Sequence, residues 1–164
     1  LDERFRLNIG KAEMERYAAK LGADCAFFIS SEPVFATGIG NVFSPIKGIR
    51  EILKGYYITI IKPNVAVSTK EAYANIIPHK PKICCRDIIK QPIETWRDLL
   101  VNDFEESVFK LHPEVENIKN KLYEQGAIYA AMSGSGSCLF AIFKAEPQYL
   151  DNCFTDCFTF SAQL

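Results

Sequence analysis

The N-terminal part of the chain combines one helical pattern with two short β-favouring runs. Across residues 11–20 apolar side chains recur at helical spacing, and Gly22 follows where a helix is expected to stop. Residues 25–29 and 34–37 are rich in β-favouring side chains, and residues 30–33 between them have the composition of a turn. The pattern predicts a short helix followed by a β-hairpin.

A buried strand and a helix signal follow. Residues 56–61 form a near-continuous apolar run, which is typical of a buried strand. Ser68 and Glu71 stand three positions apart in the order of a capping box. This signal predicts a helix that starts just after Ser68 and carries Tyr73 and Ile76.

Helices and then strands are predicted in the rest of the chain. Residues 79–91 show no clear period and predict a loop. The predicted helices are 92–100, 103–111 with Asp103 and Glu106 as an acidic capping pair, and 113–125 with Pro113 at its first position. The elements predicted after them are strands 127–132 and 138–143, a helix near 147–150 and an edge strand near 154–160.

Together these elements indicate an α+β fold, most simply an antiparallel sheet with helices packed on one face. The helix and hairpin before Gly48 have too little apolar mass for a core of their own. We therefore expect residues 1–47 to be the tail of a preceding domain and residues 48–164 to be a complete domain. The chain starts at Leu1 rather than at a methionine, so we also expect further residues upstream.

The composition favours a globular protein with a small-molecule or protein partner. With 19 basic and 20 acidic side chains the formal net charge is -1, so no positive field would attract nucleic acid or an anionic membrane. No apolar run reaches the roughly 18 residues that a membrane span needs. Six cysteines and two histidines show no spacing typical of a metal site, and we expect free thiols. The sequence predicts no nucleic-acid partner, no membrane contact, no metal-ligating set and a cytoplasmic location.

Residues 133–137 alternate serine and glycine between two predicted strands. Gly134 and Gly136 would let a ligand approach the backbone, while Ser135, Ser137 and the backbone N–H groups could bind an anion. A flexible hairpin has the same composition, so both interpretations stay open. No GxxxxGK[ST] segment occurs, and the loop is therefore not a Walker A loop.

Asp24 stands at the junction between the predicted helix end and an apolar segment. An aspartate there commonly hydrogen-bonds its neighbours in a turn. A carboxylate beside Phe27 and Phe28 would also be partly desolvated, which is one way to tune a general base. Local features leave both roles open.

Four short segments, in this order, resemble one family of small-molecule kinases. They are Gly-Ala-Asp-Cys-Ala-Phe-Phe at 22–28, Ala-Thr-Gly-Ile-Gly at 36–40, Asn-Asp-Phe-Glu at 102–105 and Met-Ser-Gly-Ser-Gly-Ser at 132–137. Their order and spacing resemble the 4-diphosphocytidyl-2-C-methyl-D-erythritol kinase family of the GHMP kinase superfamily. The last segment resembles a motif that many GHMP kinases share, whereas the first two point to this one family. The resemblance implies a ferredoxin-like GHMP kinase C-terminal domain at residues 48–164, preceded by the tail of the N-terminal kinase domain.

The resemblance also implies an activity and its residues. The reaction is transfer of the γ-phosphate of ATP to a hydroxyl of 4-diphosphocytidyl-2-C-methyl-D-erythritol, in non-mevalonate isoprenoid biosynthesis. Asp24 matches the catalytic aspartate, which accepts or orients the hydroxyl proton while Mg²⁺ neutralises phosphate charge. Thr69 and Tyr73 match a threonine and an aromatic residue of the cytidine pocket, and on a helix they would share one face. A helix cap and a core tyrosine are the alternative for this pair, and residues 134–137 would lie near phosphate.

The chain departs from the family pattern in its extent. It has neither the loop that cradles the ATP phosphates nor the lysine that partners the catalytic aspartate, both of which belong to the family's N-terminal region. We therefore expect a C-terminal fragment that lacks its N-terminal domain, is inactive alone, binds ATP and Mg²⁺ poorly and exposes apolar surface for self-association. Cys25 and Ala26 also differ from the residues usual in the family. Two alternatives stay open: a GHMP kinase for homoserine, mevalonate or a sugar, and a non-catalytic α+β ligand-binding module.

Overall fold

A computed structural model of the chain describes residues 2–22, 24–74, 76–148 and 150–164. The chain divides into two compact units, residues 1–49 and 50–164. The first unit holds α1 (Asp2–Phe5), α2 (Lys11–Leu21), α3 (Phe27–Ser30), β1 (Val34–Thr37) and β2 (Val42–Pro45). The second unit holds β3 (Tyr57–Pro63), α5 (Thr69–Tyr73), α6 (Cys85–Ile88), η1 (Ile93–Thr95), α7 (Trp96–Leu99), α8 (Phe104–Leu111), α9 (Pro113–Glu124), β4 (Tyr129–Met132), β5 (Leu139–Phe143), α10 (Leu150–Cys153) and β6 (Cys157–Gln163). Helix α4 (Ile49–Leu53) spans the division.

The helix predicted before Gly22 is confirmed as α2, and the Gly22 N–H closes it on the Ala18 carbonyl at 3.3 Å. The strand predicted at 25–29 is wrong. Residues 24–26 form a turn that runs into α3, because the Phe27 N–H bonds back to the Asp24 carbonyl at 3.2 Å. The hairpin is made instead by β1 and β2, which pair antiparallel.

Apolar side chains lie at the surface of the first unit. Phe5, Leu7 and Phe28 are exposed, while Phe27 and Phe35 are half-buried. This unit therefore shows open apolar surface of the kind that favours association with another surface.

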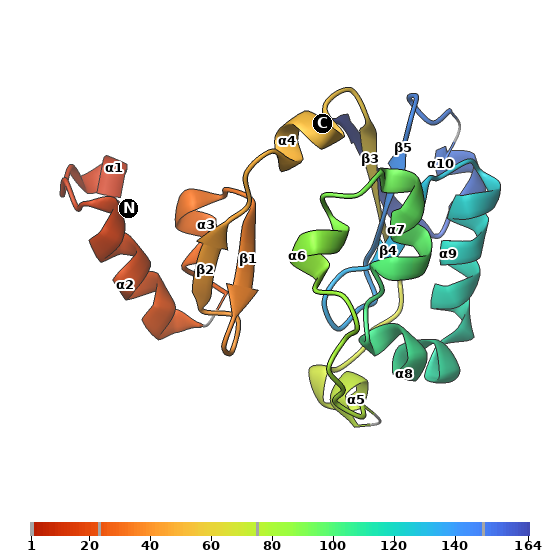
Figure 1. Cartoon of the computed structure of the whole chain (residues 1–164), viewed down its shortest axis with the longest axis horizontal. Coiled ribbons are helices and arrows are strands. Elements are labelled where there is room, and N and C mark those ends of the chain that lie inside the picture. The colour runs from red at the N-terminus through yellow and green to blue at the C-terminus, as the bar shows by residue number, and fades with distance from the viewer. Residues whose placement is uncertain (1, 23, 75, 149) are drawn as a thin grey trace. The chain divides into compact units, whose positions relative to one another are not determined.

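The second unit is built on a four-stranded antiparallel sheet in the order β4-β5-β3-β6. Strand β3 is central and confirms the buried strand predicted at 56–61, since Thr59 and Ile61 have no exposed surface. Helices α8 and α9 lie on the same side of the sheet (Figure 1). A strand, a helical segment, two strands, a short helix and an edge strand follow each other along the chain, as in a split βαβ or ferredoxin-like unit. The predicted α+β class is confirmed.

The core of the second unit lies between the sheet and helices α8 and α9. Its fully buried members come from alternate positions of the strands and from one face of each helix: Ile61, Val108, Val115, Leu122, Ala130, Leu139 and Ala141. Each large aliphatic side chain buried in this way contributes about 1.5 to 3 kcal/mol relative to an exposed one. The core therefore fixes α8 against the end of β4.

At the ends of α5, α8 and α9, two predicted features are confirmed and two differ from the prediction. The capping box at Ser68 is confirmed, but α5 ends at Tyr73, so Ile76 lies outside it. The predicted cap by Asp103 is wrong, because Asp103 makes no side-chain cap bond to α8. Helix α9 starts at Pro113 as predicted.

Three further segments also differ. The predicted loop 79–91 contains helix α6, and the predicted helix 92–100 is a 3-10 turn followed by α7. The helix predicted near 147–150 starts only at Leu150, as α10, and Tyr149 lies outside the described residues.

Candidate functional site

The predicted site residues fall in both units. Thr69, Tyr73 and the loop 134–137 belong to the second unit, whereas Asp24 belongs to the first. The structure thus brings two of the three predicted subsites into one unit and does not relate Asp24 to them.

Asp24 lies in the turn before α3 and is exposed. Its carboxylate approaches the β1–β2 turn so closely that a Cβ at Gly40 would lie 2.9 Å from Oδ1. Gly40 also has a φ of 91°, which favours glycine. The two segments at 22–28 and 36–40 therefore meet at Asp24, while Ala23 lies outside the described residues.

Helix α5 presents Tyr73 at the surface of the second unit. The capping box fixes the start of the helix, with the Glu71 N–H donating to Ser68 Oγ at 3.1 Å. Tyr73 is 61% exposed, and its ring meets Phe104 edge to face at 4.7 Å between centroids. Thr69, one turn earlier, is exposed as well. Because it is exposed, Tyr73 is not a core residue of this unit and leaves aromatic surface open to a ligand.

A histidine ties this helix to its neighbours. His112 Nε2 lies 3.1 Å from Glu71 Oε1, and its Nδ1 lies 3.5 Å from Glu114 Oε1. His112 stands at the junction of α8 and α9, so this contact holds the capping box of α5 against both helices.

The glycine loop, residues 133–137, joins β4 to β5. The Ser133 N–H donates to the Cys138 carbonyl at 2.8 Å, and the Gly136 N–H donates to the Ser133 carbonyl at 3.1 Å. Gly134 and Gly136 have φ values of 55° and 89°. A Cβ at Gly134 would meet nothing within 4 Å, whereas a Cβ at Gly136 would lie 2.7 Å from Met132 Sδ. Gly134 is therefore the open point of the loop, and Gly136 is the packed one.

The far end of the glycine loop is bound to the segment that leads from β3 to α5. Ser137 is buried, and its hydroxyl donates to the Val65 carbonyl. Lys62 Nζ donates to Ser137 Oγ at 3.2 Å and to the Pro63 carbonyl at 2.8 Å. The Ser137 hydroxyl is thus bound within the protein. The positive charge of Lys62 lies beside the loop, and the sequence did not predict this neighbour.

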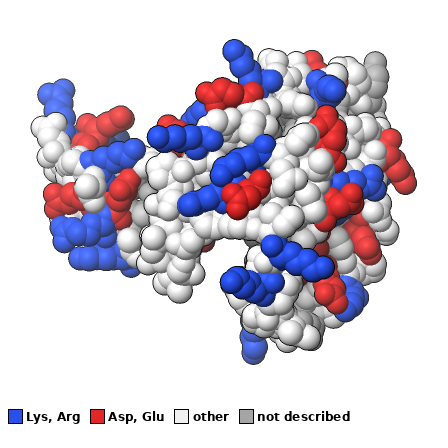
Figure 2. Space-filling model, in the orientation of Figure 1, with Lys and Arg blue, Asp and Glu red and all other residues white. Residues whose placement is uncertain are grey.

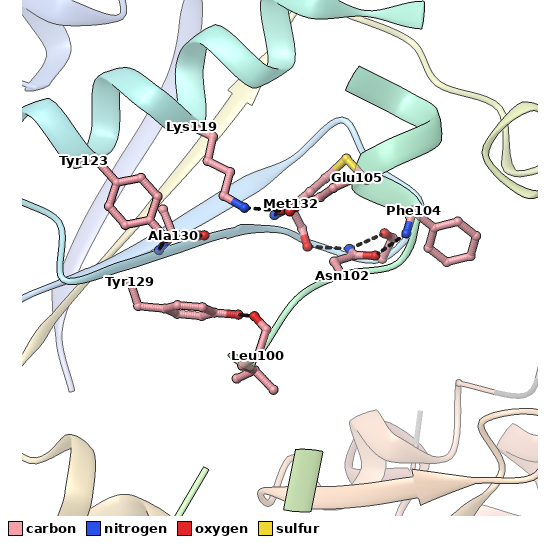
Figure 3. Close-up of polar contacts among 10 residues, drawn as sticks. Leu100, Asn102, Phe104, Glu105, Lys119, Tyr123, Tyr129, Ala130 and Met132 are labelled. Carbon is pink, nitrogen blue, oxygen red and sulfur yellow. Dashed lines mark hydrogen bonds and ion pairs between the residues drawn. The ribbon is translucent and has the colours of Figure 1, made fainter. Parts of the chain in front are cut away.

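Side chains from two helices bind the free edge of β4 (Figure 3). The Tyr123 hydroxyl donates to the Ala130 carbonyl and accepts the Ala130 N–H, both at 3.1 Å. Glu105 Oε1 accepts the Met132 N–H at 2.8 Å. The backbone groups of this edge are therefore satisfied by side chains rather than by a further strand.

Asn102 binds both the glycine loop and helix α8. Its Nδ2 donates to the Met132 carbonyl at 2.7 Å and to the Gly134 carbonyl at 2.8 Å. Its Oδ1 accepts the Phe104 N–H at 2.9 Å and so provides the cap that Asp103 does not. The only signal for these contacts in the sequence is the motif at 102–105 itself.

Two phenols near this edge are held neutral. The Tyr129 hydroxyl donates to the Leu100 carbonyl at 2.8 Å, and burial, followed by the charge of Glu105, raises the pKa of Tyr129 well above its usual value. Burial also raises the pKa of Tyr123. Both side chains therefore act as hydrogen-bonding groups without charge.

A hollow of about 520 Å³ lies at the start of α8. Its walls include Ile76, His79, Val101, Asn102 and Ser107. The Ser107 hydroxyl is buried and has no hydrogen-bond partner among the described residues. The hollow adjoins the segment after α5, so it lies near the elements that carry Tyr73 and Phe104.

Acidic and basic side chains both occur on the face of the second unit that Figure 2 shows. Within the described ranges, no three His, Cys, Asp or Glu side chains gather to hold a metal ion. In the same part of the chain, no helix is both long enough and apolar enough to cross a membrane.

Residues 86–150 match the family model described as GHMP kinases C terminal. A 4-diphosphocytidyl-2-C-methyl-D-erythritol kinase from Bacteroides thetaiotaomicron is 55% identical over 146 residues, which cover 89% of this chain and 52% of that protein. The kinase of the same name from Bacteroides fragilis is 48% identical over 164 residues, which cover 100% of this chain and 59% of that protein. The chain thus spans a little over half the length of the curated relatives it matches.

A solved structure shares the fold. The crystal structure of 4-(cytidine 5'-diphospho)-2C-methyl-D-erythritol kinase matches with a TM-score of 0.76 at 20% identity. The match covers 98% of this chain and 60% of that one.

Proposed function

Because the chain belongs to the GHMP kinases through their C-terminal region, we propose that it is part of an ATP-dependent kinase that phosphorylates a hydroxyl of 4-diphosphocytidyl-2-C-methyl-D-erythritol. The observation that carries the proposal is the 48% identity over all 164 residues with a kinase of that name. This reaction would supply a step of non-mevalonate isoprenoid biosynthesis.

Each predicted site residue has a role in this proposal. The exposed ring of Tyr73 stacks on the cytosine, and Thr69 on the same helix hydrogen-bonds the nucleotide. Gly134 and Ser135 offer backbone N–H groups near the phosphates, and Gly134 leaves room for close approach. Gly136 shapes the loop beside them, since its N–H donates to the Ser133 carbonyl. The last loop residue, Ser137, supports the loop from inside, since its hydroxyl donates to the Val65 carbonyl.

Asp24 is proposed to accept or orient the proton of the substrate hydroxyl, and Gly40 beside it leaves space for the carboxylate. Mg²⁺, bound with ATP, would neutralise the charge on the transferred phosphate. We assign no residue of this chain to the metal ion.

We further propose that the 164 residues alone are inactive and bind ATP poorly. Phosphoryl transfer depends mostly on positioning and on charge neutralisation. The family's phosphate-cradling loop lies in the N-terminal domain, which would be the partner of the surface that exposes Phe5, Leu7 and Phe28. Without that domain the same surface would favour self-association.

All six cysteines are free, which supports a cytoplasmic location.

The experiment is a comparison of acceptors. The full-length protein, with labelled ATP and Mg²⁺, is offered 4-diphosphocytidyl-2-C-methyl-D-erythritol, homoserine, mevalonate or galactose in separate reactions. We expect product with the cytidylated acceptor and a value of kcat/KM at least about a hundredfold lower with the others. Phosphorylation of homoserine, mevalonate or galactose instead would favour a sibling kinase, and binding without turnover of any acceptor would favour a non-catalytic module.

A further inference from the structure

We propose that Asn102 is a positioning residue that holds the glycine loop in register with the helix that carries Tyr73. The inference rests on the proposed function, which gives these two segments a shared ligand. It assigns to Asn102 a role in phosphate transfer that acts through the loop and not through contact with the substrate.

The carboxamide of Asn102 makes three hydrogen bonds. It donates two hydrogen bonds, to the Met132 and Gly134 carbonyls at 2.7 and 2.8 Å, and accepts one from the Phe104 N–H at 2.9 Å. A carbonyl oxygen can only accept, so the NH₂ group must face the loop and the oxygen must face α8. The contacts therefore fix the orientation of the amide as well as its position.

These contacts connect the two proposed subsites of the second unit, the glycine loop and the helix that carries Tyr73. Met132 and Gly134 stand on either side of Ser133, the first residue of the glycine loop. Asn102 therefore binds the loop where the loop leaves β4. Phe104, whose N–H is bound by the same amide, packs edge to face on Tyr73 at 4.7 Å between ring centroids. A single side chain thus connects the open point of the loop to the ring that is proposed to bind cytosine.

The other end of the loop is bound to the segment that leads into helix α5. Ser137 donates to the Val65 carbonyl, in the segment that runs from β3 to α5. Because this end is fixed, we expect the rest of the loop to move chiefly at Gly134. A Cβ built at Gly134 would have no neighbouring atom within 4 Å, so this residue has space around it. Loss of the two hydrogen bonds from Asn102 is therefore expected to make the loop more mobile at Gly134.

The substitution Asn102→Asp separates the binding of the glycine loop from the capping of α8. It keeps an oxygen that can accept the Phe104 N–H, and a negative charge at the start of α8 is favourable. It removes both donors and places a carboxylate against the Met132 and Gly134 carbonyls. The helix should remain capped while the loop is released. Asn120→Asp, an exposed position on α9, is the matched control for the change in charge.

Two readouts are taken on the full-length protein. The Ser133 N–H is bonded to the Cys138 carbonyl just beyond the loop, and the Gly136 N–H is bonded to the Ser133 carbonyl within it. Hydrogen exchange at both amides therefore reports the order of the loop. We expect exchange at both amides to be at least about tenfold faster in Asn102→Asp than in Asn120→Asp. We also expect kcat to fall at least about tenfold, with KM for the cytidylated substrate within about threefold of the control.

The outcomes are distinct. Equal exchange in the two variants would reduce Asn102 to a cap of α8 and overturn the inference, as would faster exchange with an unchanged kcat. If the full-length wild type shows no kinase activity, the proposed function fails. The exchange measurement alone then decides whether Asn102 holds the loop.

Discussion

Lys119 Nζ lies 2.6 Å from Glu105 Oε2, and the other oxygen of the same carboxylate accepts the Met132 N–H at 2.8 Å. The two side chains are only 16% and 9% exposed. Charges so far from water are tolerated only when each has a partner. The pair therefore fixes α9, α8 and the last residue of β4 relative to one another, next to the glycine loop.

Lys119→Met should destabilise the chain strongly, because it leaves the Glu105 carboxylate buried without a counter-charge. We expect a loss of about 3 kcal/mol in the free energy of unfolding, the lower end for a broken buried pair. Urea unfolding, followed by the fluorescence of the single tryptophan, Trp96, measures the loss. Lys110→Met is the control, since Lys110 pairs with Glu106 at 2.8 Å on the exposed side of α8 and should matter little. Equal losses in the two variants would contradict this role for the pair.

Local signals in the sequence predicted the elements that carry the site. Two helix starts are examples: the capping box of Ser68 and Glu71 begins α5, and Pro113 begins α9. Each signal acts on residues within one helical turn, so a short segment of sequence is enough to predict where the helix begins. The serine–glycine segment likewise lies between the two strands that its neighbours predicted. These features need no knowledge of the rest of the chain.

The remaining features depend on distant partners. Residues 25–29 favour a strand by composition, but β1 pairs with β2 and leaves them to form a turn and α3. Asn102 and Glu105 find their partner Met132 about thirty positions later, and no local pattern states that distance. The same holds for Lys62, which reaches the glycine loop only because β3 and β5 are neighbours in the sheet.

Asp24→Asn should lower the turnover of the full-length protein by about 10² to 10⁴, the range for a lost general base. The amide cannot take the proton of the substrate hydroxyl, although it fits the space beside Gly40. Steady-state kinetics with labelled ATP and the cytidylated substrate measure the effect. Asp98→Asn, an exposed position on α7, is the control and should keep normal turnover. Near-normal turnover of the Asp24 variant would leave this residue a role in the turn alone.

Gly136→Ala should cost more stability than Gly134→Ala. Both positions have positive φ, so each substitution introduces backbone strain of about 1 kcal/mol. At Gly136 the new Cβ would also lie 2.7 Å from Met132 Sδ, whereas at Gly134 it would meet open space. Crowding of this kind costs about 1 to 3 kcal/mol. Parallel urea unfolding of the two variants measures the difference, and equal stabilities would show that Met132 moves aside freely.

Alkaline pH should destabilise the second unit through Tyr129. Its pKa is raised on folding, chiefly by burial, while the unfolded phenol titrates near 10. Above that pH the unfolded state binds fewer protons than the folded state. The free energy of unfolding therefore falls, by up to about 1.4 kcal/mol per pH unit from this residue.

Tyr129→Phe removes this contribution, although it also loses the hydrogen bond to the Leu100 carbonyl. Its stability should be lower than that of the wild type at pH 8 but should fall less steeply between pH 10 and 11. Urea unfolding across this range measures both slopes. The same slope in both proteins would show that Tyr129 ionises freely in the folded state.

The proposed stacking of cytosine on Tyr73 would link this chain to its proposed substrate. The ring is 61% exposed and is supported from one side by Phe104. Tyr73→Ala should therefore cost about 1 to 3 kcal/mol of affinity for the cytidylated substrate, the range for stacking of a base on an aromatic side chain. Tyr73→Phe keeps the ring and should bind nearly as well as the wild type.

The most direct measurement is a calorimetric titration of the full-length wild type, Tyr73→Ala and Tyr73→Phe with 4-diphosphocytidyl-2-C-methyl-D-erythritol, alongside a titration of each with ATP. The proposed function predicts that only the alanine variant loses affinity for the cytidylated substrate, by roughly 5- to 150-fold in Kd, while ATP affinity is the same in all three. An unchanged Kd in Tyr73→Ala, or no binding of the cytidylated substrate by the wild type, would contradict it.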